Sequence, residues 1–153
     1  MILHEQRIIA KLNTLTNSEI VLSQEQYNRF DAQNDKGIFE IKHRHTFYED
    51  LFIEFEKYSY NLMYALELDL QFFYVVSMQG VIYMFDIVKL DQMNYDYQWH
   101  WKALPSTTEF ENNDERNKFV GLLNLGAAFL KLDDNGKGNY NSSAKSGGRI
   151  ISP

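Results

Sequence analysis

The sequence predicts an α+β domain in which an antiparallel meander of three to four strands packs against a long central helix and a C-terminal helix. Three patterns predict this fold. Apolar residues recur at helical spacing through residues 47–68, and β-branched and aromatic residues dominate residues 72–90. Aromatic rings then alternate with polar side chains over residues 95–102, which is the period of two that a strand requires.

Two helices are expected before the first strand. Residues 2–15 place apolar side chains on one helical face at i, i+4 and i+7. Ser23 and Gln26 have the spacing of a capping box, so we expect a second helix to begin there and to run to about residue 33. Gly37 follows as a residue that can adopt the left-handed conformation after a helix.

A strand over residues 38–45 is expected to join the edge of the sheet and to lead into the central helix. Thr46 and Glu49 have the spacing of another capping box, and we expect the helix over residues 47–68 to follow them. This helix is apolar on more than one side, so other elements should cover it on several sides.

The meander itself follows the central helix. Gln79 and Gly80 separate the expected strands at residues 72–78 and 81–90, and we expect them to form a tight hairpin turn. The third strand is expected over residues 95–102.

A final helix and a tail complete the predicted organisation. Asn112 and Glu115 have the spacing of an N-terminal cap, and apolar residues recur at helical spacing over residues 119–130. Residues 133–153 are rich in Gly, Ser and Asn, so we predict one globular domain over residues 1–132 and a flexible tail after it.

Composition excludes several classes of function. The chain has 153 residues, no cysteine and a formal net charge of −6. The absence of cysteine excludes disulfides, thiolate metal sites and a cysteine nucleophile. The acidic balance disfavours nucleic acid as a partner, because backbone binding relies on clustered Lys and Arg. No apolar run has the length of a membrane span and the first residues do not resemble a signal peptide. We therefore expect a cytoplasmic protein that does not contact membrane and needs no cofactor.

The candidate metal ligands are His43, His45 and Glu49, with His100 as a further histidine. Histidines at i and i+2 of a strand point to the same side and can both bind a divalent metal. Counted from Gly37, this spacing resembles the first metal-binding motif of the cupins, β-barrel proteins that hold a divalent metal with such residues. The second cupin motif is absent. The resemblance implies a metal-dependent enzyme, which stays open as the alternative function.

The remaining features favour a non-enzymatic protein-binding module. Aromatic residues make up 15% of the chain, and Tyr and Trp are enriched at protein interfaces. We predict an inhibitor, an adaptor or a self-associating protein, whose composition is typical of AT-rich phage or mobile-element genes. Its expected partner is another protein or a second copy of the chain. The residues expected to contact this partner are Asp50, Glu54, Tyr95, Tyr97, Trp99 and Trp101.

Overall fold

A computed structural model of the protein describes residues 2–23, 29–105, 115–133 and 138–140. Within this part of the chain, the main sheet has seven strands in the order β1-β2-β3-β5-β6-β9-β10. Their bounds are β1 Val21–Leu22, β2 Ala32–Gln33, β3 Gly37–Arg44, β5 Gln71–Met78, β6 Val81–Asp86, β9 Leu130–Leu132 and β10 Gly138–Tyr140. A second sheet of three strands has the order β4-β8-β7. Its strands are β4 Asp50–Glu54, β7 His100–Pro105 and β8 Glu115–Asn124.

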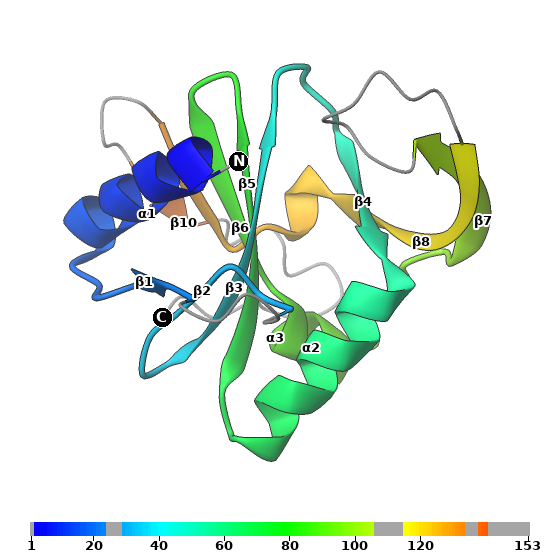
Figure 1. Ribbon diagram of the computed structural model, residues 1–153, viewed down its shortest axis with the longest axis horizontal. Coiled ribbons are helices and arrows are strands. Elements are labelled where there is room, and N and C mark those ends of the chain that lie inside the picture. The colour runs from blue at the N-terminus through cyan, green and yellow to red at the C-terminus, as the bar shows by residue number, and fades with distance from the viewer. Residues whose placement is uncertain (1, 24–28, 106–114, 134–137, 141–153) are drawn as a thin grey trace.

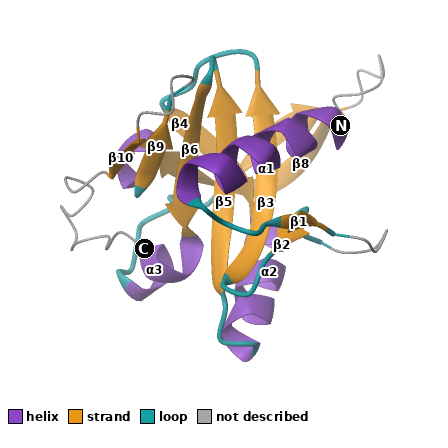
Figure 2. Ribbon diagram, turned by 90° about the vertical axis from the view of Figure 1, so that its left-hand side faces the viewer, coloured by secondary structure: helices purple, strands orange, loops and turns teal. Residues whose placement is uncertain are grey.

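The helices lie on both sides of the main sheet. They are α1 (Ile2–Thr16), α2 (Phe55–Glu67) and α3 (Ile87–Gln92), with a short 3₁₀ turn at Leu125–Ala127. Figure 1 shows the main sheet nearly edge-on, with α1 on one side of it and α2 and the second sheet on the other. Figure 2 shows α1 crossing in front of β3 and β5.

The centre of the main sheet is a parallel pair, β3 and β5, joined by a connection that contains β4 and α2. β5 then turns back into β6 through a two-residue turn in which Gln79 and Gly80 have φ values of 50° and 81°. Two positive φ values are what a tight hairpin of this kind requires. The core on either side of these strands includes Leu12, Phe72 and Phe85, all fully buried.

Several predictions from the sequence are confirmed. The chain has the predicted α+β class, the helix predicted over residues 2–15 is α1, and the hairpin at Gln79 and Gly80 forms between β5 and β6. The strand predicted over residues 38–45 is β3. It does not lie at the sheet edge, however, since it pairs with β2 on one side and with β5 on the other.

The central helix is shorter than predicted. Residues 50–54 form β4, and the helix α2 begins only at Phe55. Leu51 and Ile53 alternate with more exposed neighbours and are buried against the rest of the fold, which is strand behaviour. The sequence prediction failed because apolar residues at 47, 51 and 55 fit a helix while those at 51 and 53 fit a strand equally well.

The predicted C-terminal helix is also wrong, because residues 115–124 form β8 in the middle of the second sheet. Gly121 in this strand packs closely against two aromatic residues. A Cβ atom there would lie 2.8 Å from Cβ of Tyr97 and 3.0 Å from the indole of Trp99. The glycine therefore makes room for two rings rather than for a neighbouring helix. The expected cap at Asn112 lies outside the described residues.

Two further segments differ from the predicted meander. The second strand stops at Asp86, whose carboxylate accepts a hydrogen bond from the backbone N–H of Lys89 and so caps α3. Residues 95–99 are not a strand, and Gln98 has a φ of 54°. The antiparallel meander of three strands is therefore reduced to the β5–β6 hairpin and the later strand β9.

The helix predicted between Ser23 and residue 33 is contradicted where it can be seen. Residues 24–28, which include the cap partner Gln26, lie outside the described residues, but Ala32 and Gln33 form β2. Of the predicted tail, residues 138–140 pair with β9 as β10, and residues 134–137 and 141–153 lie outside the described part. The division at residue 132 stays a prediction.

Candidate functional site

Five charged side chains from four segments gather where β2 begins beside β3. We call them the charged cluster. They are Glu5 of α1, Asp31 just before β2, Glu40 and Lys42 of β3, and Lys57 of α2.

Strand geometry places the two residues from β3. Glu40 and Lys42 are two positions apart, so both side chains project from the same face of the sheet. The β2–β3 ladder ends with Ala32 opposite Phe39, which places Asp31 opposite Glu40. The carboxylate of Asp31 accepts a hydrogen bond from the backbone N–H of Ile41 at 2.7 Å. A side chain thus satisfies the strand amide that β2 leaves unpaired.

Glu40 is the buried centre of the cluster, with 1% of its side chain exposed. Nζ of Lys57 lies 2.7 Å from its Oε2, and Nζ of Lys42 lies 3.2 Å from the same oxygen. A buried carboxylate is expensive unless it is paired, and the two ammonium groups supply that pairing. Both lysines keep part of their side chains exposed, at 25% and 40% for Lys42 and Lys57.

The carboxylates of the cluster repel one another. The pKa of Asp31 is raised to about 6, mainly by burial and also by the negative charges of Glu40 and Glu5, while the hydrogen bond from Ile41 opposes the shift. Burial also raises the pKa of Glu5, with repulsion by Glu40 in the same direction. Negative charge in the cluster is therefore only partly compensated.

Lys42 stays protonated in this environment. Burial alone lowers the pKa of its ammonium group, but the carboxylates of Glu40 and Asp31 more than offset this, so the pKa lies above its usual value. A permanently charged lysine next to two carboxylates can neutralise an anionic ligand, whereas it cannot accept a proton near neutral pH.

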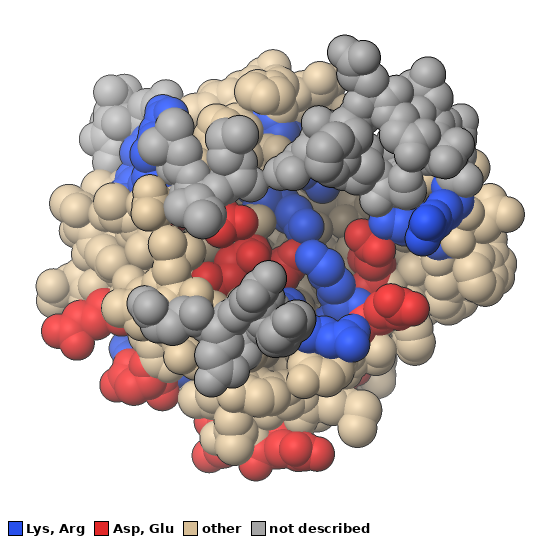
Figure 3. Space-filling view, in the orientation of Figure 1, with Lys and Arg blue, Asp and Glu red and all other residues tan. Residues whose placement is uncertain are grey.

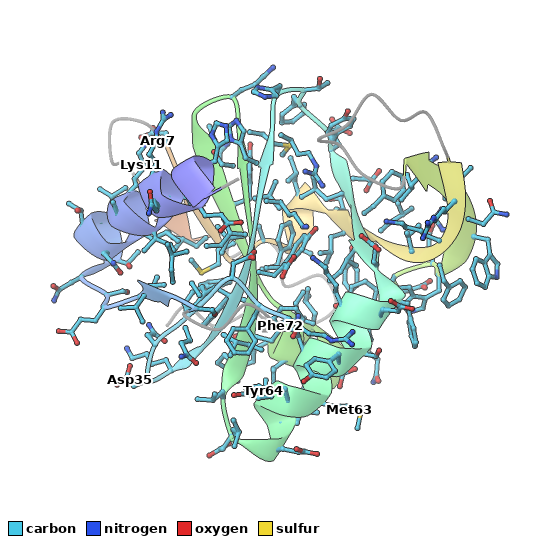
Figure 4. All side chains as sticks on the ribbon, viewed as in Figure 1. Arg7, Lys11, Asp35, Met63, Tyr64 and Phe72 are labelled. Carbon is cyan, nitrogen blue, oxygen red and sulfur yellow. The ribbon has the colours of Figure 1, made fainter. Side chains whose placement is uncertain are left out.

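The charges of both signs gather in a depression of one face of the molecule. Figure 3 shows Asp and Glu side chains next to Lys and Arg side chains in the middle of this face, between α1 and the second sheet. In Figure 4, Arg7 and Lys11 lie on the outer side of α1, and Met63 points away from the sheet on α2.

Sequence reasoning missed the charged cluster. It assigned Glu40 and Lys42 to a strand at the sheet edge without giving them a role, and it placed Asp31 in a helix. The available signal was a glutamate and a lysine at i and i+2 with Ile38, Phe39 and Ile41 around them, because such charges cannot be buried without partners.

The six residues predicted to bind a partner lie in several different environments. Tyr97 is buried at 3% exposure, and together with Trp99 it packs on Tyr58 of α2 at ring distances of 5.1 and 4.9 Å. Trp101 is 69% exposed. On the second sheet, Asp50 accepts a hydrogen bond from Asn124. The hydroxyl of the half-buried Tyr95 accepts one from the same residue's backbone N–H, and Glu54 pairs with Lys118 at 3.3 Å.

Two of the four predicted metal ligands are brought together. The ring centroids of His43 and His45 are 4.9 Å apart, and His4 of α1 stacks on His43 at 4.0 Å. Glu49 lies in the β3–β4 connection and does not cap a helix, while His100 lies beside Phe52 on the second sheet. Among the described residues, no three His, Asp or Glu side chains are arranged closely enough to hold a metal by themselves.

Comparisons with known proteins find similarity to a solved structure, but to no family model. No protein-family model matches the chain, and no curated protein does. A solved structure that matches is that of Hjc from Archaeoglobus fulgidus, a Holliday junction resolvase from an archaeal hyperthermophile. The match covers 78% of this chain and 95% of that chain, at 11% sequence identity and a TM-score of 0.45.

Two functional expectations are corrected at this point. The sequence predicted a non-enzymatic protein-binding module and disfavoured nucleic acid as a partner, whereas the matching solved structure is that of a resolvase. Both predictions rested on the absence of a catalytic constellation and on net charge. Among the described residues, no helix is long and apolar enough to cross a membrane.

Proposed function

We propose that the protein is a divalent-cation-dependent enzyme that hydrolyses phosphodiester bonds of nucleic acid at the charged cluster. One observation carries the proposal: the carboxylates of Asp31 and Glu40 and the ammonium group of Lys42 project to one site from adjacent strand positions. Carboxylates that can bind a cation, next to a lysine that can bind phosphate, suit this chemistry.

The donor set fits a hard divalent cation. Mg²⁺ prefers oxygen ligands and is held by one or two carboxylates, with water and substrate phosphate completing its octahedral shell. Asp31 and Glu40 supply two such carboxylates, so a third protein ligand is not required. Their mutual repulsion, which contributes to the raised pKa of Asp31, would be relieved by a bound cation.

The bound cation supplies charge neutralisation of the phosphate and a lower pKa for a water molecule. The reaction forms a bond between the water oxygen and phosphorus and breaks the bond between phosphorus and one sugar oxygen, which takes up a proton. Lys42, always protonated, faces the charge that develops on the phosphate oxygens. Glu5, whose pKa is raised by burial, is the residue we assign to accept the proton from water.

Lys57 acts as a positioning residue. Its ammonium group holds Glu40 at 2.7 Å, and it comes from α2, on the side of β3 opposite to α1. We assign it the role of fixing the orientation of the Glu40 carboxylate, since charge-assisted hydrogen bonds of this length are strong and directional.

Cleavage assays on labelled DNA test the proposal. Single-stranded, duplex and branched substrates are incubated with the protein in Mg²⁺, in Mn²⁺ and in EDTA. We expect cleavage that requires the cation and that falls by about 100-fold or more in Asp31→Asn, Glu40→Gln and Lys42→Met.

The β2–β3 turn offers matched control variants. Asp35→Asn and Lys36→Met change exposed residues of the same types a few positions away, and Figure 4 shows Asp35 pointing outward from the far end of the hairpin. These controls should cleave as the unchanged protein does. Cleavage that survives all three cluster variants, or no cleavage of any substrate by the folded protein with either cation, would contradict the proposal.

A further inference from the structure

The second sheet has two chemically different faces. Strand β7 lies at one edge of it, and its residues alternate between the two faces. The pairing of β7 with β8 sets Trp101 opposite Phe119 on one face and Lys102 opposite Lys118 on the other.

The aromatic face presents an open ring on a rigid support. Trp101 is 69% exposed, and its ring lies 5.1 Å from that of Phe119. Phe119 is itself stacked on Trp99 at 5.9 Å, and Trp99 contacts Tyr58 of α2. A large exposed ring backed by packed rings is a preformed stacking surface, because little side-chain entropy is lost when a planar ligand binds.

On the basic face, positively charged side chains lie next to one another. Lys102 and Lys118 stand directly opposite each other, a cross-strand arrangement that is unfavourable by itself, and Arg116 follows opposite Leu104. Lys102 lies over the ring of Phe52 at 5.0 Å, and Lys118 pairs with Glu54. Three cations against two carboxylates, those of Glu54 and Asp50, leave this face with an excess of positive charge that suits a polyanion.

The basic face adjoins the charged cluster. The hydroxyl of Tyr74 donates a hydrogen bond to the carbonyl of Phe52 in β4 and so ties the main sheet to the second one. Burial raises the pKa of this hydroxyl, and the negative charges of Glu40 in the charged cluster and of Glu54 in the second sheet both raise it further. Figure 3 shows Lys and Arg side chains over the second sheet on the same face of the molecule as the central acidic groups.

From these observations we propose that an unpaired DNA strand passes around the edge strand β7, with a base stacked on Trp101 on the aromatic face and the neighbouring phosphates on the basic face, at Lys102 and then at Lys118 and Arg116. The proposal rests on the proposed function and narrows its substrate class to DNA that contains an unpaired segment. A base inside a duplex has no free face for stacking, whereas an unpaired base does. The side chain between Trp101 and the end of β7 on the aromatic face, Ala103, is apolar, which suits deoxyribose better than a ribose hydroxyl that needs a partner.

Fluorescence anisotropy with labelled oligonucleotides in EDTA, where no cleavage occurs, tests the proposal. The full chain should bind a mixed-sequence single strand more tightly than a blunt duplex of the same length. Trp101→Ala should weaken single-strand binding about 10-fold, in line with the loss of one base–ring stack, and should leave duplex binding unchanged. Trp101→Phe should retain most of the affinity.

Two control variants separate stacking from charge. Tyr60→Ala removes another exposed ring, 46% exposed on α2, and should not change binding. Lys102→Gln should reduce the slope of log K against log salt by about 0.7, the value for one phosphate contact on a single strand. An unchanged thermal midpoint checks that each variant is folded.

Some outcomes would overturn the proposal without touching the proposed function. Equal affinity of Trp101→Ala and Tyr60→Ala for the single strand would refute the stacking role. An RNA strand bound as tightly as DNA of the same sequence would refute the choice of sugar. Asp31→Asn should bind normally and fail to cleave, so loss of cleavage in that variant tests the active site alone, and loss of affinity in Trp101→Ala tests the strand site alone.

Discussion

Strand β3 carries two polar clusters that respond to pH in opposite directions. Its even positions contribute Glu40 and Lys42 to the charged cluster. Its odd position His43, together with His45 just past the end of the strand, forms a histidine cluster with His4. Helix α1 supplies one member to each cluster. Charges of both signs stabilise the first cluster, whereas protonation of the second brings like charges together.

The direction of each pKa shift decides how each cluster acts on stability. Burial raises the pKa of Asp31 to about 6, so the folded state holds this proton more tightly than the unfolded state does. That contribution is complete below pH ~4 and is lost as the pH rises through about 6. Burial lowers the pKa of His43, with His4 and His45 adding repulsion. Its contribution is present above pH ~6.5 and is lost as the pH falls.

The largest effect on stability is expected from Glu40→Ala. The change leaves the ammonium groups of Lys42 and Lys57 without the carboxylate that both of them contact and opens a hole in a buried position. We expect a loss of about 2–3 kcal/mol in the free energy of unfolding, below the full cost of breaking a buried pair because both lysines can reach water. Urea unfolding at pH 7 measures it.

Glu54→Ala is the matched control for this change. Glu54 is 37% exposed and pairs with Lys118 at 3.3 Å, so its removal should cost about 0.5 kcal/mol or less. A similar loss of unfolding free energy in both variants would mean that burial does not strengthen the ion pairs of Glu40. The contrast drawn between the two sites would then be wrong.

The second-largest effect on stability is expected from Asp31→Asn, which should stabilise the protein although it changes the same cluster. Asp31→Asn should stabilise the protein by about 1–2 kcal/mol at pH 7, because it removes a negative charge that Glu40 and Glu5 repel, while the amide oxygen can still accept from the N–H of Ile41. The gain should shrink towards pH 4, where Asp31 is protonated anyway. Thermal melts from pH 4 to pH 7 measure it.

Addition of Mg²⁺ sharpens that test. A cation that binds the carboxylates should raise the melting temperature of the unchanged protein at pH 7 and should do so far less for Asp31→Asn, because a ligand stabilises only the state that binds it. If Asp31→Asn is destabilised at pH 7 and Mg²⁺ shifts both proteins equally, Asp31 is an ordinary structural hydrogen-bond acceptor.

The parts of the fold that the sequence predicts correctly are those where local pattern and burial agree. The α1 helix has one apolar face, and Gln79 and Gly80 both take the positive φ values that their hairpin requires. The remaining elements of the fold depend on pairing between segments that are distant in the sequence. Residues 50–54 and 115–124 become strands because they pair with each other, and no spacing within either segment indicates a partner so far along the chain.

The charged cluster could not be predicted from the sequence for the same reason. Asp31 and Glu40 are close in sequence, but their meeting depends on a β2–β3 pairing that an expected helix ruled out, and Glu5 and Lys57 arrive from elements on opposite sides of the sheet. Two members of the histidine cluster were predicted to lie together, because His43 and His45 have the period of a strand. Its third member, His4, comes from α1 and stacks at 4.0 Å only because that helix crosses β3.

The smallest expected effect comes from the histidine cluster. His43→Gln removes the imidazole that contacts both of its neighbours, so it should relieve their repulsion when they are protonated. We expect the variant to lose less stability than the unchanged protein between pH 7 and pH 5, by about 0.5 kcal/mol or less because the ring is close to solvent. His100→Gln, on the second sheet, is the control and should follow the unchanged protein. If His43→Gln shows the steeper loss on acidification, the imidazoles attract a counter-charge rather than repel one another, and the two faces of β3 do not oppose each other in their response to pH.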